Sequence, residues 1–408
     1  MTHFVFEING FNEVDHLSPV AHQLLTRQHR VTFITLDYKP QTNEPRIKHL
    51  FNFTDFNLLC VNEIFSNFQL KIFQKLLRLF FGRYTRHLTS NHTRLNLLTK
   101  VANLLGLLRV QPSFDPGCVI SGWGDPTSQL CVLGRLRCLP VIGLPHGYPC
   151  VKNSNFNPHI SKIIESSKQL PDFSLRNHFT RYVVATERNK RMLQDWSMSP
   201  AVIETWGNLR FSPEWVFLLQ KMVPEFQFTG PLSGAHKVLM FLPSSGSNFK
   251  SSELKHLLSE LAREKIDLVL KPHTREGQDL SRVIPNHLWN ASNVRIASNY
   301  DSTALMLWAE TVINFATGTA LEALIINKRL VFAKYLTTNQ LSWEDCGGIV
   351  IAESEKVVID SIRDRDWRVD QSAAEPYLKQ ELFVGGIVQD PLTYCAERLE
   401  LLAGDSQR

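Results

Sequence analysis

Short apolar segments alternate with helical stretches along this 408-residue chain, and this alternation restricts the fold more than any other feature. In the N-terminal half, the pattern predicts a strand at 3–8, a Gly-containing loop at 9–15, a helix at 18–28 and a strand at 31–35. The last of these is almost wholly apolar, as expected of a strand that is buried in a parallel sheet. Further strands are expected at 118–121, 141–144, 181–185 and 203–205. This order predicts a doubly wound α/β domain.

The same alternation starts again after a polar, proline-containing segment at 226–236. The chain is long enough for two domains, each with a core of its own. We expect strands at 237–242, 266–271, 311–315 and 330–333, with helices at 252–263, 302–309, 319–326 and 392–402. We therefore predict an N-terminal domain at 1–212, a linker at 213–236, a C-terminal domain at 237–385 and a terminal helical segment at 386–408.

The composition excludes several classes of protein. With 43% hydrophobic and 20% charged residues, the chain is typical of a soluble globular protein. No apolar run is long enough to span a bilayer, and residues 1–3 lead into a strand without the pattern of a signal peptide. The seven cysteines are scattered and form no CxxC pair, which indicates reduced thiols in the cytoplasm and argues against a zinc site. We expect neither a metal ion nor a cofactor.

The net charge is only +5, but the charges are distributed unevenly. Between Glu63 and Asp115 there is no acidic residue, whereas lysines and arginines are interleaved there with leucines and phenylalanines. A basic amphipathic helix can lie on an anionic bilayer surface. A core helix with a solvated basic face explains the same pattern, so both interpretations stay open for 65–110. Because no nucleic-acid-binding motif accompanies the charge, we expect no nucleic acid partner.

A turn in the C-terminal half is the best candidate for binding a phosphate. The expected strand at 311–315 stops before Thr317-Gly318-Thr319, and Glu322 lies in the first turn of the helix that follows. Unpaired N–H groups, two hydroxyls and the positive end of a helix suit a phosphate, and a carboxylate one turn further along can accept hydrogen bonds from a ribose. An ordinary strand-to-helix turn with a hydroxyl N-cap explains the same residues.

Two other segments follow expected strands of the C-terminal half. Lys271-Pro272-His273 stands where open α/β sheets bind their ligands, and a lysine there can offer charge to a diphosphate. Ser244, Ser245 and Gly246 are small enough for backbone N–H groups to approach an anion closely. A surface loop and a flexible connector are the plain alternatives. The sequence has neither a P-loop lysine here nor GxGxxG after the first strand, so a dehydrogenase has no support.

His16 is the candidate general base of the N-terminal half. It stands at the end of the expected loop at 9–15, and the ordinary pKa of a histidine is close to neutrality. Asp15 beside it, or Glu7, is a candidate for orienting the ring. His146, after the expected strand at 141–144, has the same placement. A capping or surface histidine remains the alternative for both.

Together these segments resemble the GT-B superfamily of nucleotide-sugar glycosyltransferases, which has relatives among the UDP-GlcNAc 2-epimerases and the CDP-glycerol glycerophosphotransferases. The run at 15–35 is similar to the family's Gly-His-x-x-Pro motif and the strand after it, with Asp15 in place of the glycine and Gln28 in place of a later one. The segment at 181–187, followed by Thr205-Trp206-Gly207-Asn208, resembles the close of the acceptor domain. The segments at 269–273 and 317–323 are similar to the K/R-P-H-P element and to the S/T-G-T-x-x-x-E-A donor signature.

The resemblance implies two Rossmann-like domains that face each other across a cleft, with the acceptor bound by 1–212, the nucleotide sugar by 237–385, and 386–408 crossing back to the first domain. Thr317, Gly318 and Thr319 would contact the phosphates, and Glu322 the ribose. Further donor-binding residues would stabilise the leaving diphosphate without a metal ion, and these are Lys271, His273, Ser244, Ser245 and Gly246. His16 would deprotonate an acceptor hydroxyl for an inverting attack.

The function favoured by the resemblance is a glycosyltransferase that moves a sugar from a nucleotide-sugar donor to a surface polysaccharide or glycolipid acceptor. A CDP-glycerol-type glycerophosphotransferase is the first alternative, with His146 as the base. A UDP-sugar 2-epimerase needs several carboxylates, for which only Asp125 and Glu187 offer themselves, and a non-catalytic nucleotide- or glycan-binding module is the last alternative. We expect the protein in the cytoplasm, either free or peripheral on the inner face of the cytoplasmic membrane.

Overall fold

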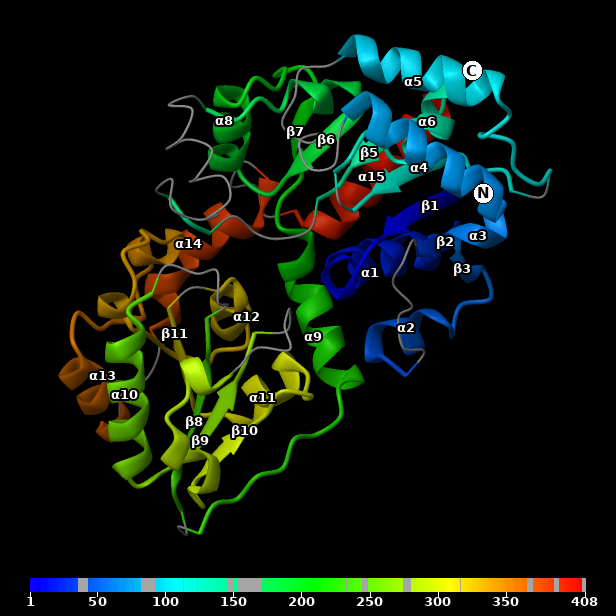
Figure 1. Cartoon of the computed structure of the whole chain (residues 1–408). Coiled ribbons are helices and arrows are strands. Elements are labelled where there is room, and N and C mark those ends of the chain that lie inside the picture. The colour runs from blue at the N-terminus through cyan, green and yellow to red at the C-terminus, as the bar shows by residue number, and fades with distance from the viewer. Residues whose placement is uncertain are drawn as a thin grey trace. The chain divides into compact units, whose positions relative to one another are not determined.

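The computed structural model describes residues 1–35, 43–81, 92–112, 114–122, 124–145, 150–152, 170–231, 234–243, 249–273, 280–315, 317–364, 370–384 and 389–405 (Figure 1). The chain divides into two compact units. Unit 1 comprises Met1–Gly147, Gln169–Ser212 and Gln380–Arg408, and unit 2 comprises Tyr148–Lys168 and Pro213–Lys379. Part of the segment that the sequence suggested as a linker is instead a helix of unit 2, α9 (Pro213–Met222). Among the described residues of the expected linker at 213–236, only residues that follow this helix have the irregular structure of a linker.

Unit 1 is built on a seven-stranded parallel sheet with the order β3-β2-β1-β4-β5-β6-β7. All strands except β3 were expected from the sequence. β1 in the middle of the sheet is buried over its whole length, since the chain covers both faces of the sheet. The strands are β1 (His3–Ile8), β2 (Arg30–Thr35), β3 (Phe56–Cys60), β4 (Cys118–Ser121), β5 (Val141–Gly143), β6 (Arg181–Val184) and β7 (Ile203–Thr205).

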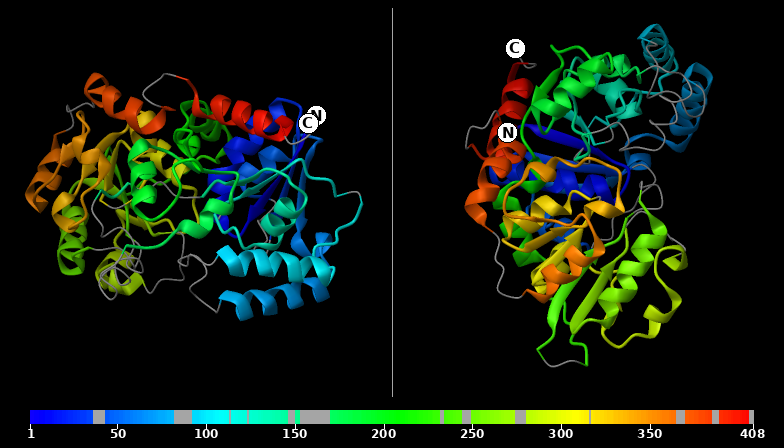
Figure 2. Two further views of the ribbon diagram at one scale, coloured as in Figure 1. Left: turned by 90° about the horizontal axis from the view of Figure 1, so that it is seen from above. Right: turned by 90° about the vertical axis from the view of Figure 1, so that its left-hand side faces the viewer.

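The helices of unit 1 pack around this sheet. They are α1 (Phe11–Thr26), α2 (Pro45–Leu50), α3 (Val61–Ile64), α4 (Asn67–Phe81), α5 (His92–Leu104), α6 (Gln129–Leu136), α8 (Glu187–Asp195) and α15 (Pro391–Asp405), with the 3₁₀ helices η2 (Ser174–His178) and η3 (Leu209–Phe211). Figures 1 and 2 show α4 and α5 side by side at the outside of this unit. α15 packs against α1, where Arg27 Nη2 lies 2.8 Å from Glu400 Oε2.

α1 differs from the sequence-based expectation. It begins at Phe11 rather than at residue 18, so the segment at 9–15 is mostly helix and His16 lies inside the helix instead of at the end of a loop. The cause is the apolar row of Val14, Leu17, Ala21 and Leu24, whose spacing of three and four residues gives one buried face. That buried face continues through Pro19, which stands in the helix interior.

Unit 2 contains a six-stranded parallel sheet with the order β10-β9-β8-β11-β12-β13. The strands are β8 (His236–Phe241), β9 (Ile266–Lys271), β10 (Val294–Ile296), β11 (Thr311–Asn314), β12 (Arg329–Phe332) and β13 (Val350–Ile351). The helices are α9, α10 (Ser251–Arg263), α11 (Ser302–Trp308), α12 (Thr319–Ile325), α13 (Glu355–Arg363) and α14 (Gln371–Leu382), which ends beyond the boundary of the unit. The short 3₁₀ helices are η4 (Leu280–Arg282), η5 (Asn286–Asn290), η6 (Lys334–Leu336) and η7 (Ser342–Asp345).

Each sheet has one point where the strand order reverses. In unit 1 this point lies between β1 and β4, and in unit 2 it lies between β8 and β11. Open α/β sheets bind ligands just outside the carboxyl ends of the strands at such a point, because the connections on its two sides turn away in opposite directions. Among the helices of the described ranges, none combines the length and the apolar character that crossing a membrane requires.

Candidate functional site

The turn after β11 stands at the reversal point of unit 2. Asn314 ends the strand, is fully buried, and ties the turn together with its side-chain amide. Its Nδ2 donates to the Thr317 carbonyl at 3.0 Å and to Thr319 Oγ1 at 3.2 Å, and its Oδ1 accepts from the Thr317 N–H at 3.2 Å. An asparagine at this position therefore fixes a loop that backbone bonds alone would leave loose.

The three residues of the turn remain accessible above this anchor. Thr317, Gly318 and Thr319 are partly exposed, whereas the chain from Ala320 to Leu324 is buried. The Oγ1 atoms of Thr317 and Thr319 lie 3.3 Å apart, within hydrogen-bond distance of each other. Two adjacent hydroxyls at the start of a helix can donate to the same oxyanion. The geometry thus brings together the hydroxyl groups that the sequence suggested for phosphate binding.

Glu322 does not share this accessibility. Its side chain has no exposed surface, and Thr303 Oγ1 of α11 donates a hydrogen bond to its Oε1. A buried carboxylate needs such a donor because burial without one is costly. The structure therefore holds Glu322 inside unit 2, where a ribose does not reach it without a change in this hydrogen bond.

Lys271 ends β9 and is engaged by the backbone. Its Nζ donates to the carbonyls of Ser298 at 2.8 Å and Tyr300 at 2.7 Å. Burial lowers the pKa of Lys271 to about 8, although the nearby Asp301 raises it. The side chain thus fixes the segment before α11 and adds positive charge at the carboxyl edge, beside the partly exposed His273. The other donor-loop candidates, Ser244, Ser245 and Gly246, lie outside the described residues.

The reversal point of unit 1 is closely packed around α1. A Cβ at Gly122, just after β4, would lie 2.7 Å from Leu17 Cδ1 and 3.2 Å from the Glu7 carbonyl, so only glycine lets α1 approach this loop. Asp125, further along the same loop, is used locally. Its Oδ1 accepts from the Thr127 N–H at 2.9 Å and from Thr127 Oγ1 at 2.7 Å.

Asp15 on α1 lies between two buried arginines. Its Oδ1 is 2.9 Å from Arg46 Nη2, at the start of α2, and its Oδ2 is 2.7 Å from Arg210 Nε in η3. Burial opposes ionisation of Asp15, but the charges of Arg210 and Arg46 outweigh it and hold its pKa well below the usual range. Asp15 therefore stays ionised at neutral pH and links α1, α2 and η3. His16 beside it is partly exposed, and His146 lies outside the described residues.

The comparisons identify the fold, although the sequence matches no protein-family model and no curated protein. The UDP-GlcNAc 2-epimerase of Neisseria meningitidis, bound to UDP-GlcNAc, is 13% identical with a TM-score of 0.54 over 99% of both chains. Arabidopsis thaliana UGT89C1 complexed with UDP is 13% identical with a TM-score of 0.54 over 100% of both chains. The glycosyltransferase SnogD of Streptomyces nogalater is 17% identical with a TM-score of 0.51 over 98% of this chain and 99% of its own. The chain has the GT-B fold.

The GT-B assignment confirms the expected fold class, an α/β protein with two Rossmann-like parallel sheets. At these identities the likeness establishes the fold alone. The acceptor and donor roles of the two GT-B units, and the residues that would carry them, stay proposals.

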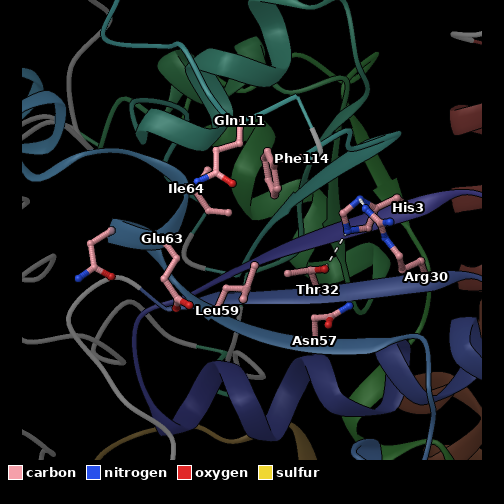
Figure 3. A pocket seen from close by; sticks show the side chains of 10 residues that line it. His3, Arg30, Thr32, Asn57, Leu59, Glu63, Ile64, Gln111 and Phe114 are labelled. Atoms are coloured by element: carbon pink, nitrogen blue, oxygen red, sulfur yellow. Dashed lines mark hydrogen bonds between the residues drawn. The ribbon is translucent and has the colours of Figure 1, made fainter.

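A cavity of about 570 Å³ lies elsewhere in the first GT-B unit (Figure 3). It is lined by side chains of β1, β2 and β3, including His3 and Thr32, which point away from α1 toward Phe114. Burial and the nearby charge of Arg30 together lower the pKa of His3 to about 4, so the ring is neutral at pH 7. His3 and Arg30 begin their strands, so this end of the cavity lies opposite the carboxyl edge of the sheet, where open α/β sheets bind their ligands.

Sequence reasoning did not find the partners that define these groups. Asn314 carries a recognisable signal, since asparagine side chains often bind the backbone of a turn, and Asn314 stands three residues before Thr317-Gly318. Thr303, Arg46 and Arg210 carry no such signal. They come from segments far away in the sequence, and only the fold brings them to Glu322 and Asp15.

Proposed function

We propose that this protein is an enzyme that uses a nucleotide sugar, and specifically a metal-independent glycosyltransferase with an inverting mechanism. One observation carries the proposal. An accessible Thr317-Gly318-Thr319 turn, anchored by the buried Asn314, lies at the reversal point of the second sheet in a GT-B fold. Proteins of the same fold have been crystallised with UDP-GlcNAc and with UDP. This supports binding of a nucleoside diphosphate at the same kind of edge.

In this proposal the hydroxyls of Thr317 and Thr319 bind the diphosphate, which becomes the leaving group. Lys271 contributes positive charge, and two of the three N–H groups of its ammonium already bind backbone carbonyls. The loop with Ser244, Ser245 and Gly246 follows β8, on the other side of the reversal point, and would add backbone donors. For Glu322 to bind a ribose diol, ribose hydroxyls would have to replace the hydrogen bond from Thr303.

The acceptor would be a glycan or a lipid-linked glycan bound by unit 1. His16 is our candidate for the base that takes the proton of the acceptor hydroxyl, and Asp15, fixed between two arginines, would hold the helix that carries it. His146 is the alternative base, which fits a glycerophosphotransferase using a CDP-linked donor. Synthesis of a surface polysaccharide or glycolipid at the inner face of the cytoplasmic membrane is the setting we propose.

A sugar-nucleotide 2-epimerase is the second candidate, since the epimerase of Neisseria meningitidis matches over nearly the whole chain. Two observations count against it. Asp125 accepts two hydrogen bonds from Thr127, and Glu187 accepts one from Thr205, so both candidate carboxylates already have local partners. An elimination needs carboxylates that are available to the sugar.

Donor binding is the first test. A ligand that binds only the native state raises the melting temperature, so UDP-, GDP-, CMP- and CDP-linked compounds can be compared directly. Thr317→Val and Thr319→Val should each weaken the effective nucleotide roughly tenfold, because each removes a hydrogen bond to a charged phosphate. Thr26→Val, at the exposed end of α1, is the matched control. Equal binding by all variants, or stabilisation by none of the compounds, would refute the proposed donor site.

Turnover then separates the candidate reactions. His16→Ala should leave donor binding intact and abolish sugar transfer, whereas His256→Ala, an exposed histidine of α10, should affect neither. Incubation of the effective nucleotide sugar without acceptor, followed by proton NMR, detects inversion at C2. A C2 epimer formed without any acceptor would replace the transferase by the epimerase.

A further inference from the structure

The helices α4 and α5 form an antiparallel pair. At one end, Gln69 Nε2 donates to the carbonyls of Gly106 and Arg109 at 3.0 and 2.9 Å, which joins the start of α4 to the segment after α5. At the other end, Arg94 Nη1 donates to the Phe80 carbonyl at 3.0 Å, which joins the start of α5 to the end of α4. Both helices lie at the outside of unit 1 (Figures 1 and 2). The two helices therefore lie side by side from one end of the pair to the other.

The inner side of this pair is fixed by apolar spacing. Phe73, Leu77 and Phe81 are buried at intervals of four residues along α4. Leu95, Leu98 and Ala102 are buried at intervals of three and four residues along α5. These spacings place each set on a single helix face. The opposite face of each helix consequently points into solvent.

That opposite face carries large apolar side chains. Phe68 and Leu79 of α4 are 70% and 77% exposed, and Leu97 and Leu104 of α5 are 47% and 86% exposed. The two residues on each helix are separated by close to a whole number of turns, so they lie on the same face of that helix. Scattered exposed leucines are normal on a soluble protein, but a group gathered on one face marks an interaction surface. We call these four residues the outer apolar row.

Basic side chains accompany the outer apolar row. Lys71, Lys75 and Arg78 are exposed on α4, and Lys100 is exposed on α5. The sequence contains no acidic residue between Glu63 and Asp115 that would neutralise them. Long basic side chains can keep their charge in water while their stems cover apolar surface. The surface thus combines exposed hydrocarbon with positive charge and with no negative charge of its own.

We propose that the outer face of α4 and α5 binds the surface of an anionic lipid bilayer. The two helices would lie parallel to the membrane, with the outer apolar row at the boundary of headgroups and acyl chains and the basic side chains against lipid phosphates. A second protein would not require the uniform positive charge, and a nucleic acid would not require the exposed leucines. The inference extends the proposed function, since a lipid-linked acceptor resides in such a bilayer. Vesicle binding can nevertheless be tested without any catalysis.

The charge requirement is tested by flotation of the full chain with vesicles of phosphatidylcholine alone or mixed with phosphatidylglycerol. We expect binding only to the anionic vesicles, and weaker binding as salt is added. Each basic residue near an anionic surface contributes about 1 kcal/mol, or roughly fivefold in affinity. The triple variant K71Q/K75Q/R78Q should therefore bind roughly a hundredfold more weakly. The control K221Q/K265Q/K356Q removes the same number of positive charges from exposed lysines of unit 2, and it should bind vesicles like the wild type.

The apolar requirement is tested with Phe68→Ser and Leu104→Ser, each expected to weaken vesicle binding roughly tenfold. Trp289→Ser is the control, since Trp289 is 48% exposed in unit 2. All these variants should have the melting temperature of the wild type and the same increase in melting temperature when the effective nucleotide binds. A loss of vesicle binding can therefore be told apart from a loss of donor binding. Equal binding to neutral vesicles, an unaffected triple variant, or self-association that depends on the outer apolar row would overturn the proposal.

Discussion

Replacing Asp15 by asparagine removes one negative charge from between two arginines and keeps the size of the side chain. Arg46 and Arg210 are 3% and 4% exposed, and Asp15 itself is 19% exposed. Arg46 keeps a second carboxylate, since its Nη1 lies 2.5 Å from Glu44 Oε1. Removing one partner of a buried ion pair costs about 3–5 kcal/mol, because a buried charge loses its compensation. We expect Asp15→Asn to destabilise unit 1 by that amount.

Glu400→Gln provides a matched control on the same helix packing. Glu400 lies 2.8 Å from Arg27 Nη2 and 2.8 Å from His29 Nε2, so it too has two basic side chains as partners. The side chains of Arg27 and Glu400 are 31% and 28% exposed, and an ion pair with such access to solvent contributes only about 0–1 kcal/mol. The two variants change charge alike and differ in burial. Their difference therefore measures what burial adds.

The measurement is urea-dependent hydrogen exchange of peptides from β1 and β2, read by mass spectrometry. Peptides of unit 1 are needed because a protein of two units need not unfold in one step. Asp15 has a lowered pKa in the folded state, so its contribution is present at neutral pH and is lost as the pH falls below about 4. The gap between wild type and Asp15→Asn should shrink in that range.

Two outcomes would refute the reasoning. The first is a destabilisation by Asp15→Asn no larger than that by Glu400→Gln. The second concerns Arg210→Met, which removes the charge and keeps much of the volume. Combined with Asp15→Asn it should recover part of the loss, because fewer uncompensated charges then remain buried. Strict additivity of the two changes would show that the cluster is not electrostatically coupled.

Three further predictions concern single residues. Gly207→Ala should cost unit 1 at least about 2 kcal/mol more than Gly234→Ala costs unit 2, because both glycines have positive φ but only the Cβ at position 207 would meet a neighbour, the Leu382 carbonyl at 2.6 Å. Urea-dependent hydrogen exchange of peptides from each unit measures this difference. Stability should fall as the pH drops from about 6.5 to 4, since burial lowers the pKa of His22 to about 4, and His22→Gln should flatten the profile by up to about 1.4 kcal/mol per pH unit. Asn314→Ala should destabilise unit 2 by about 2–3 kcal/mol and weaken nucleotide binding, measured by calorimetry.

The three strands that were not predicted from the sequence share one property. β3, β10 and β13 all stand at sheet edges, and most of their residues are half-buried or exposed. An interior strand such as β9 is apolar because both of its faces are covered, whereas an edge strand need not be. Apolar runs therefore predicted every interior strand of both sheets, but of the four edge strands they predicted only β7. The doubly wound class follows from the middle alone, which is why the fold class was predictable.

The error at α1 has a local cause. Ser18 followed by Pro19 has the pattern of an N-cap and a first helical residue, where proline is favoured. In the structure Ser18 Oγ instead donates to the Val14 carbonyl one turn back, so both residues stand inside the helix. A helix start at 18 makes His16 a loop residue. Because Val14 and Leu17 belong to the buried face of α1, the helix includes His16, which is partly exposed.

The carboxylates show where reading a site from sequence reaches its limit. Asp15 and Glu322 were both selected for their positions in motifs, and the structure gives each of them a buried partner from a distant segment, Arg210 and Thr303. A carboxylate that is already satisfied stabilises the fold, and it acts on a ligand only if the ligand offers a better partner than the one it has. Thr303→Val decides this for Glu322. If Glu322 only supports the fold, this change should lower stability and leave the nucleotide affinity as it was; if Glu322 binds the ribose, releasing it from Thr303 should strengthen nucleotide binding.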